Sequence, residues 1–299
     1  MPKSSSKSKV PSLLLLGLLG AAASSLLVSP APAYACSCSR PGVEVAPGAG
    51  VAAPINTVVR VSWWIGEVKV DESTLQVAPA AAAASAGKPR SKKDKDKVAD
   101  PVESETSAFT AGQVRTVTLR PKLPLEPETR YEVRAASVAG EKLGVIGEFT
   151  TGPAADDKPP EWAGVSKAIY VHQPAVCCNC STNDPYAQID LADAGNTSDD
   201  ATPPAALVYG VWLDDGSKLE PGAAPAGQPV VVTRAWSGKL YLGHKSECAP
   251  VNFELPGKAT TVKLRVAPID LAGHVGKVVN VSVDVPKPKE PPARPPAKR

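Results

Sequence analysis

Six cysteines are the most reactive side chains of this 299-residue chain, and three of them stand almost side by side. They are Cys36, Cys38, Cys177, Cys178, Cys180 and Cys248. Thiolate sulfur, together with the imidazoles of His172 and His244, could bind zinc or copper(I). The run Cys177–Cys180 nevertheless lacks the paired Cys-x-x-Cys knuckles of a zinc site. We therefore expect disulfides rather than a metal or another cofactor, provided that the chain is exported.

The pairing of the cysteines stays open. Cys177 and Cys178 suit different partners better than each other, because a disulfide needs Cβ atoms about 3.8 Å apart in a suitable orientation. Cys248 is the expected partner of one of them, and such a bridge would stabilise the fold by roughly a few kcal/mol. Cys36 and Cys38 could then pair with the remaining two and tie the start of the mature chain to its second half.

Residues 1–35 predict export. They combine a basic start, an apolar run and a cleavage site of small residues, as secretory signal peptides do. The mature chain is expected to begin at Cys36 and to be secreted, periplasmic or on the cell surface, with no transmembrane segment left. A retained anchor is disfavoured because Ser24 and Ser25 interrupt a run that is short for a bilayer. A lipid on Cys36 is a further alternative, against which bulky Tyr34 argues.

The charge balance argues against nucleic acid as a partner. The chain has 33 Lys and Arg against 30 Asp and Glu, a net charge of +3. Three lysines in residues 1–35 account for that excess, so the mature chain is neutral. Phosphate binding needs a basic face.

No catalytic residues are expected. His172, His244 and His274 are interpreted as surface or turn residues, so we predict that the protein is not an enzyme. Five aspartates could hold calcium between loops, but they lack the regular spacing of a calcium loop and are interpreted as solvated loop acids. They are Asp193, Asp199, Asp200, Asp214 and Asp215.

Residues 41–153 show the alternation of half-buried strands. Val59, Val61 and Trp63 fall on one face of a strand, with Arg60 and Ser62 on the other. Further strands are expected at Glu67–Val70, Thr116–Leu119, Tyr131–Ala135 and Val145–Thr150.

Residues 79–107 interrupt this pattern with an alanine run and a run of charges. With almost no large apolar side chain, the segment cannot offset its ordering entropy, so we expect a disordered insertion at a loop tip.

A second set of strands follows the linker Gly152–Pro160, within residues 160–286. The expected strands are Ala168–Val171, Ala187–Leu191, Ala206–Leu213, Pro229–Arg234, Lys239–Leu242, Thr261–Val266 and Val278–Val285. Short strands at this spacing without helices predict an all-β chain of two tandem β-sandwiches. Residues 287–299 form a proline-rich basic tail that favours extended polyproline II.

Three motifs in the first sandwich resemble the bacterial immunoglobulin-like domains of surface-layer and adhesive proteins. They are Pro47–Val51 with Pro54–Asn56, the corner Leu125–Tyr131, and Phe149–Gly152. The resemblance implies that Tyr131 forms a tyrosine corner, with its ring in the core and its hydroxyl on nearby backbone.

The second sandwich is a weaker match, immunoglobulin-like or fibronectin-III-like. Leu255–Gly257 repeats the corner without its tyrosine, and Ile269–His274 resembles the Asp-x-Ala-Gly-Asn turn before the last strand, with His274 in place of Asn.

The resemblance implies an exported, non-enzymatic structural and binding protein of the bacterial cell envelope or extracellular space. Its partner would be an unidentified protein or glycan, since fold alone names no ligand. The alternative is a secreted metalloprotease-inhibitor-like or metal-binding protein that uses the Cys36/Cys38 terminus and the Cys177–Cys180 cluster.

Sugar stacking on tryptophan is also conceivable, but the five tryptophans are expected to fill the core first. They are Trp63, Trp64, Trp162, Trp212 and Trp236. Trp64 has opposite parity to Trp63, so one of the two should face outward or into an interface.

Overall fold

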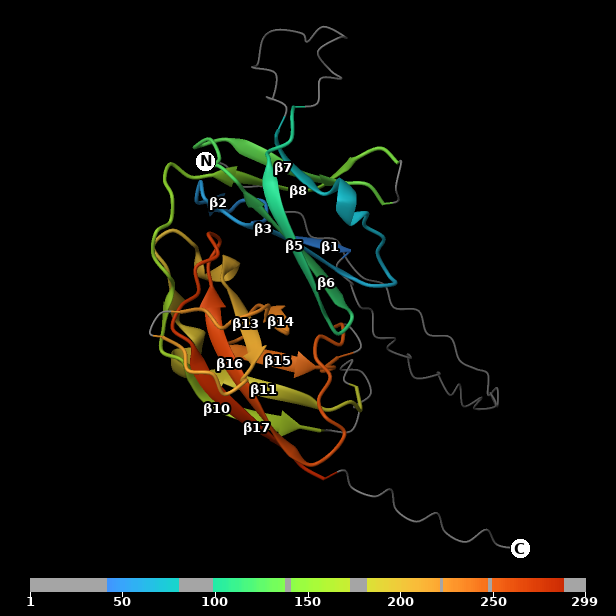
Figure 1. Ribbon diagram of the computed structural model, residues 1–299, viewed down its shortest axis with the longest axis vertical. Helices are drawn as coiled ribbons and strands as arrows, with labels where there is room; N and C mark the ends of the chain where they lie inside the picture. Colours follow the sequence, from blue (N-terminus) through green and yellow to red (C-terminus); the bar gives the residue numbers. More distant parts are fainter. Residues whose placement is uncertain are drawn as a thin grey trace, which may run out of the picture. The chain divides into compact units, whose positions relative to one another are not determined.

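The computed structural model describes residues 42–80, 99–137, 141–172, 182–220, 223–246 and 249–287 (Figure 1). The predicted signal peptide, all six cysteines, most of the predicted insertion and nearly all of the tail lie outside these ranges. The described chain is nearly all β, with three short 3-10 helices. These are η1 (Glu72–Thr74), η2 (Ala192–Gly195) and η3 (Pro204–Ala206). None of the helices in these ranges has the length and apolar character to cross a bilayer.

The first sandwich packs two four-stranded sheets against each other. One sheet has the order β1 (Val43–Ala46), β3 (Val59–Trp64), β6 (Val114–Pro121) and β5 (Ser104–Ala111). The other has the order β2 (Ala52–Ala53), β8 (Gly144–Thr151), β7 (Arg130–Ala135) and β4 (Gln76–Pro79). Neighbours are antiparallel except β2 and β8, which are parallel. This is the strand order of an immunoglobulin sandwich, with A-B-E-D facing G-F-C.

The alternation predicted for the strand at residues 59–64 is confirmed. Val59, Val61 and Trp63 are buried in the core between the two sheets. Arg60, on the other face, is also almost fully buried, because that face is covered by the second sandwich. The polar face of this strand therefore lies at an interface and not in solvent.

The predicted tyrosine corner is present. Tyr131 is the second residue of β7, and its hydroxyl accepts a hydrogen bond from the backbone N–H of Glu126 at 2.9 Å. Its buried ring stacks on Phe149, with ring centroids 5.6 Å apart. The corner thus anchors the loop before β7 to the core of the first sandwich.

The second sandwich has a three-stranded and a four-stranded sheet. The first is β10 (Val165–Val171), β11 (Tyr186–Leu191) and β15 (Lys239–Gly243). The second is β14 (Val231–Thr233), β13 (Val208–Leu213), β16 (Thr260–Ile269) and β17 (Val279–Val285). A short ladder joins β9 (Glu161–Trp162) to β12 (Thr197–Ser198). All seven predicted strand positions hold a strand, in the order A-B-E and C′-C-F-G of a fibronectin-III-like sandwich.

Two predictions for the first sandwich are wrong. Glu67–Val70 forms a turn and not a strand, because the backbone N–H groups of Glu67 and Val68 both bond to the carbonyl of Trp64. The next strand is β4 instead. The predicted insertion also ends earlier than expected, since β5 begins at Ser104 and pairs along its whole length with β6. Backbone pairing with β6 compensates for the few large apolar side chains of β5.

The two sandwiches belong to the same compact unit, and backbone hydrogen bonds join their described residues at two places. At the first contact, the backbone N–H of Val58 donates to the carbonyl of Leu271 at 2.6 Å, and Leu271 is fully buried in the core of the first sandwich. At the second, the N–H of Gln113 donates to the carbonyl of Val251 at 2.6 Å. The adjacent Gly112 has a φ of +54°, and a Cβ there would lie 2.1 Å from the Val251 carbonyl oxygen.

Candidate functional site

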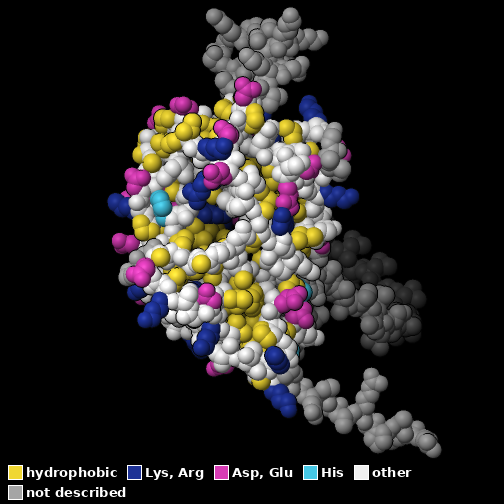
Figure 2. Space-filling model, viewed as in Figure 1, with side chains coloured by type: hydrophobic (Ala, Val, Ile, Leu, Met, Phe, Trp, Pro, Cys, Tyr) yellow, Lys and Arg dark blue, Asp and Glu magenta, His cyan; other side chains and the backbone are white. Residues whose placement is uncertain are grey.

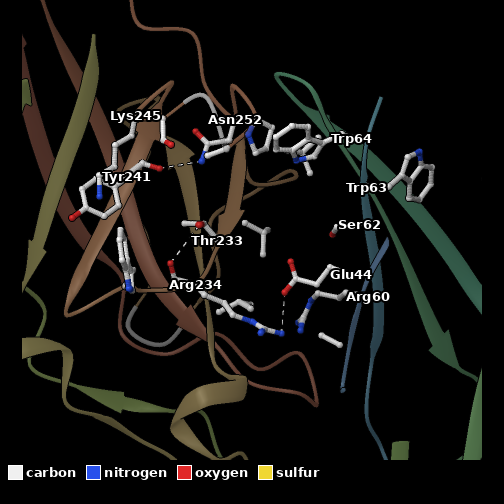
Figure 3. A pocket seen from close by; sticks show the side chains of 18 of the residues that line it. Glu44, Arg60, Ser62, Trp63, Trp64, Thr233, Arg234, Tyr241, Lys245 and Asn252 are labelled. Atoms are coloured by element: carbon white, nitrogen blue, oxygen red, sulfur yellow. Dashed lines mark hydrogen bonds and ion pairs between the residues drawn. The ribbon is translucent and has the colours of Figure 1, made fainter. Parts of the chain in front are cut away.

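A cavity of about 560 Å³ lies between β3 of the first sandwich and the segment from β14 to β15 of the second (Figure 3). We call it the inter-sandwich cleft. The side chains that give it its chemistry are Glu44, Arg60, Ser62, Trp64, Arg234, Trp236, Tyr241, Lys245 and Asn252. Its size is that of small-ligand sites in proteins, which occur preferentially at domain interfaces.

One wall comes from the even-numbered face of β3. Arg60, Ser62 and Trp64 share that face because successive side chains of a strand point to opposite sides. Trp64 lies in the cleft while Trp63 lies on the opposite face, toward the core of the first sandwich (Figure 3). The prediction that the two tryptophans face opposite ways is confirmed, and it is Trp64 that lies at the interface.

The opposite wall carries an exposed tryptophan on a tight hairpin. Trp236 and Lys239 exchange two backbone hydrogen bonds of 2.9 and 3.1 Å around Ser237 and Gly238. Both turn residues have positive φ, +49° and +70°, which suits the twist of a two-residue hairpin. Trp236 is 67% exposed, so this turn presents its ring to solvent at the edge of the cleft.

A lysine lies between two aromatic rings beside this turn. The Nζ of Lys245 is 4.3 Å from the ring centroid of Trp236 and 3.6 Å from that of Tyr241. The two rings are 6.4 Å apart and inclined at 61°. The cation is attracted to both ring faces and restricts their motion. Asn252 supports this wall from behind, because its side chain bonds to the N–H of Gly243 and the carbonyl of Tyr241.

Charges of both signs face the cleft. Arg234 of the second sandwich forms an ion pair with Glu44 of the first, with 3.1 Å between Nη2 and Oε1. Both partners are exposed, so the pair contributes little to stability and can separate. Arg60 lies deeper, and burial lowers its pKa to about 10. The cleft thus combines an aromatic platform with hydrogen-bond donors and acceptors, and its described lining holds three basic side chains, Arg60, Arg234 and Lys245, against one acidic side chain, Glu44.

The molecular surface carries no large field of one sign on the face shown in Figure 2, where acidic and basic side chains are interspersed. This agrees with the small net charge of the full chain, +3.

The three histidines lie apart from one another and outside the cleft lining. Nδ1 of His244 is 2.7 Å from Oδ2 of Asp184, and Nδ1 of His274 is 3.0 Å from Oδ2 of Asp270. His172 contacts the edge of Tyr170. In the predicted turn at Ile269–His274, the N–H of His274 also donates to Oδ1 of Asp270, so the histidine does form the turn.

The aspartates divide into two groups. Asp214 and Asp215 both pair with the buried guanidinium of Arg265, with N···O distances of 2.6 and 3.1 Å, and are therefore structural. Asp199 and Asp200 lie beside buried Asp156, and Asp199 is half-buried. The expectation of a solvated acid is thus wrong for Asp199. Asp193 is exposed at a positive φ.

Sequence reasoning missed part of the cleft. It placed Trp236 in the core, whereas Trp63 and Trp212 are buried there and Trp236 is exposed. The Ser-Gly dipeptide after Trp236 was the available signal, because that pair favours a tight turn. Tyr241 and Lys245 gave no comparable signal. The disulfide candidates Cys36, Cys38, Cys177, Cys178, Cys180 and Cys248 all lie outside the described residues, so the pairing stays a prediction.

No family model matches the chain. No curated protein matches it either.

Among solved structures, the chain is similar to the fibronectin(III)-like modules of Clostridium thermocellum CbhA, with 11% identity over 82% of this chain and 94% of that one and a TM-score of 0.24. The FN1–FN3 domains of chicken CNTN1 are 14% identical to it over 85% of this chain and 68% of that one, with a TM-score of 0.25. The titin Ig tandem A164–A165 is 11% identical to it over 82% of this chain and 95% of that one, with a TM-score of 0.14. TM-scores this low do not by themselves establish a common fold. The assignment of two immunoglobulin-like and fibronectin-III-like sandwiches therefore rests on strand order and register.

Proposed function

We propose that this protein is an exported, non-enzymatic structural and binding protein of the bacterial cell envelope or extracellular space, and that its inter-sandwich cleft binds a glycan. The sandwiches supply a scaffold, but a sandwich alone names no ligand. The choice of ligand therefore depends on the side chains of the cleft.

The exposed ring of Trp236 is the observation that carries the proposal. The rigid ring of this exposed tryptophan offers a partner a large contact area at low entropic cost. A sugar ring presents an apolar face to such a platform and hydroxyl groups around its rim. Glu44 and Arg234 line the cleft with exposed acceptors and donors for those hydroxyls.

Export is supported by the sequence of residues 1–35. The basic start, apolar run and cleavage site of small residues are typical of a cleaved leader. An extracellular location also suits a neutral surface and a cysteine content that favours disulfides.

Glycan binding is tested by tryptophan fluorescence of the purified protein. The probes are soluble polysaccharide released from the envelope of the producing cells and N-acetylglucosamine oligosaccharides of increasing length. We expect saturable quenching, with Trp236→Ala and Lys245→Ala each weakening affinity at least about tenfold. Leu123→Ala and Lys218→Ala are matched controls at exposed positions outside the cleft lining, and should bind like the wild type. Absence of binding to every probe, or unchanged affinity in Trp236→Ala, would overturn the proposal.

Export is tested by the intact mass of protein recovered from the envelope and from the medium. We expect a chain that begins at Cys36 and gains no mass on alkylation before reduction. A retained leader would contradict export. Free thiols with stoichiometric metal would support the metal-binding alternative instead.

A further inference from the structure

Carboxylates from separate segments of the chain converge beside the first contact between the sandwiches. Asp156 lies in the linker before β9, Asp199 and Asp200 follow β12, and Asp270 follows β16. Ligand atoms of Asp156, Asp199 and Asp200 all lie within 4.8 Å of one another. The same holds for Asp156, Asp270 and His274, so Asp156 is shared by both groups.

Two carboxylate oxygens of this cluster are buried without a hydrogen bond from any described residue. Asp156 is only 1% exposed, and its Oδ1 accepts from the N–H of Lys158 while its Oδ2 has no donor. Oδ1 of Asp199 accepts from the N–H groups of Ala201 and Thr202, and its Oδ2 has none. A buried carboxylate oxygen in this state is costly unless a cation binds it.

The nearby side-chain cations Lys158 and Arg60 leave the two buried oxygens of Asp156 and Asp199 unpaired. Nζ of Lys158 binds Oδ2 of Asp200 at 2.6 Å, and the guanidinium of Arg60 binds the backbone carbonyl of Asp270, not its carboxylate. Burial raises the pKa of Asp156 to about 6 and also raises the pKa of Asp270, and repulsion from Asp199 adds to both effects. The cluster therefore holds more negative charge than its surroundings balance.

We propose that a calcium ion binds Asp156 at the junction of the two sandwiches, among the carboxylates of Asp199, Asp200 and Asp270 that surround it. Calcium takes several oxygen ligands in flexible geometry and suits carboxylates that come from separate loops. The imidazole of His274 bonds to Oδ2 of Asp270 and orients that carboxylate from the outer shell. An all-oxygen inner set selects a hard cation over zinc.

The ion would join one sandwich to the other. The backbone N–H and carbonyl of Asp156 both bond to the side chain of Asn56 in the first sandwich, at 2.9 and 2.7 Å. Asp199 and Asp270 belong to the second sandwich. Calcium at this point therefore stiffens the junction beside the linker. This inference is independent of glycan binding in the cleft.

Thermal unfolding of the purified, metal-free protein tests the site directly. Added CaCl₂ should raise the unfolding midpoint by roughly 5 °C once its concentration is about 100-fold above the dissociation constant. Asp156→Asn and Asp270→Asn should abolish most of this rise. Asp157→Asn, an exposed neighbour of Asp156, is the matched control and should keep the rise in full.

Asp156→Asn also separates loss of the site from loss of folding. Without calcium, this variant should unfold at the same temperature as the wild type or higher, because it removes an uncompensated buried charge. Calorimetric titration should give one calcium per chain, bound at least tenfold more weakly by the variant. No calcium-dependent shift in the wild type, an equal shift in Asp156→Asn, or a shift with ZnCl₂ but not CaCl₂ would overturn the proposal.

Discussion

Arg60 and Asp270 are 210 residues apart in the chain, yet Nη1 and Nη2 of Arg60 both donate to the backbone carbonyl oxygen of Asp270, at 3.3 and 3.2 Å. Arg60 comes from the polar face of β3 in the first sandwich and Asp270 from the turn after β16 in the second. A buried guanidinium needs such acceptors, because each unpaired donor would cost free energy. The pair therefore holds the two sandwiches together at one end of the inter-sandwich cleft.

Arg60→Ala should weaken the junction between the sandwiches. We expect a loss of about 2 to 3 kcal/mol in the free energy of unfolding, because the variant leaves the Asp270 carbonyl buried without these donors. Urea unfolding followed by fluorescence and by circular dichroism should then show transitions that no longer coincide. Arg130→Ala, which removes an exposed ion pair with Glu148, is the control and should cost less than about 1 kcal/mol. Equal effects of the two substitutions would contradict the role of Arg60.

Gly112→Ala should destabilise the second contact between the sandwiches. A Cβ at this position would lie 2.1 Å from the Val251 carbonyl oxygen, so backbone must shift and the hydrogen bond from Gln113 to Val251 is strained. Gly216→Ala is the control, since Gly216 also has positive φ but nothing within 4 Å of the added Cβ. We expect Gly112→Ala to cost at least about 2 kcal/mol more than the control in chemical denaturation. Similar costs would mean that only the backbone conformation matters.

Tyr131→Phe should remove the tyrosine corner without creating a cavity. The N–H of Glu126 loses the acceptor of its half-buried hydrogen bond, so we expect a loss of about 1 kcal/mol in the free energy of unfolding. The ring stacking with Phe149 should persist, and the near-ultraviolet circular dichroism of the folded variant should stay close to that of the wild type. Tyr170→Phe, on half-buried β10, serves as the control. An equal effect of both substitutions would show that the corner hydrogen bond adds no stability.

The sequence predicted the sandwich cores well because their signal is local. Alternation in β3 and β17 and the motif around Tyr131 depend on residues that are neighbours in the chain. The prediction failed at Glu67–Val70, where apolar residues alternate but their backbone bonds back to Trp64 and not to a strand.

The inter-sandwich cleft could not be predicted in the same way, because it depends on contacts between distant segments. Arg60 was placed correctly on the polar face of its strand, but nothing near it in sequence indicates that Asp270 covers that face. Asp199 and Asp156 are likewise distant in the chain and meet only because the sandwiches fold against each other. Local spacing detects a calcium loop from consecutive residues and misses one assembled from three segments.

Stability without calcium should depend on pH through Asp156. Burial raises the pKa of this carboxyl from 3.8 to about 6, so the folded protein holds its proton more tightly than the unfolded chain does. The contribution of Asp156 to stability is therefore greatest below pH 3.8 and falls as the pH rises from there to about 6. A shift of this size corresponds to a loss of about 3 kcal/mol. Urea unfolding in calcium-free buffer between about pH 4 and pH 7 measures this decrease. Comparison with variants separates the titration of Asp156 from that of Asp270, Asp199 and His274, which face it. Asp156→Asn should flatten the decrease, whereas Asp157→Asn should leave it unchanged. A slope that persists in Asp156→Asn would assign the titration to another group of the cluster.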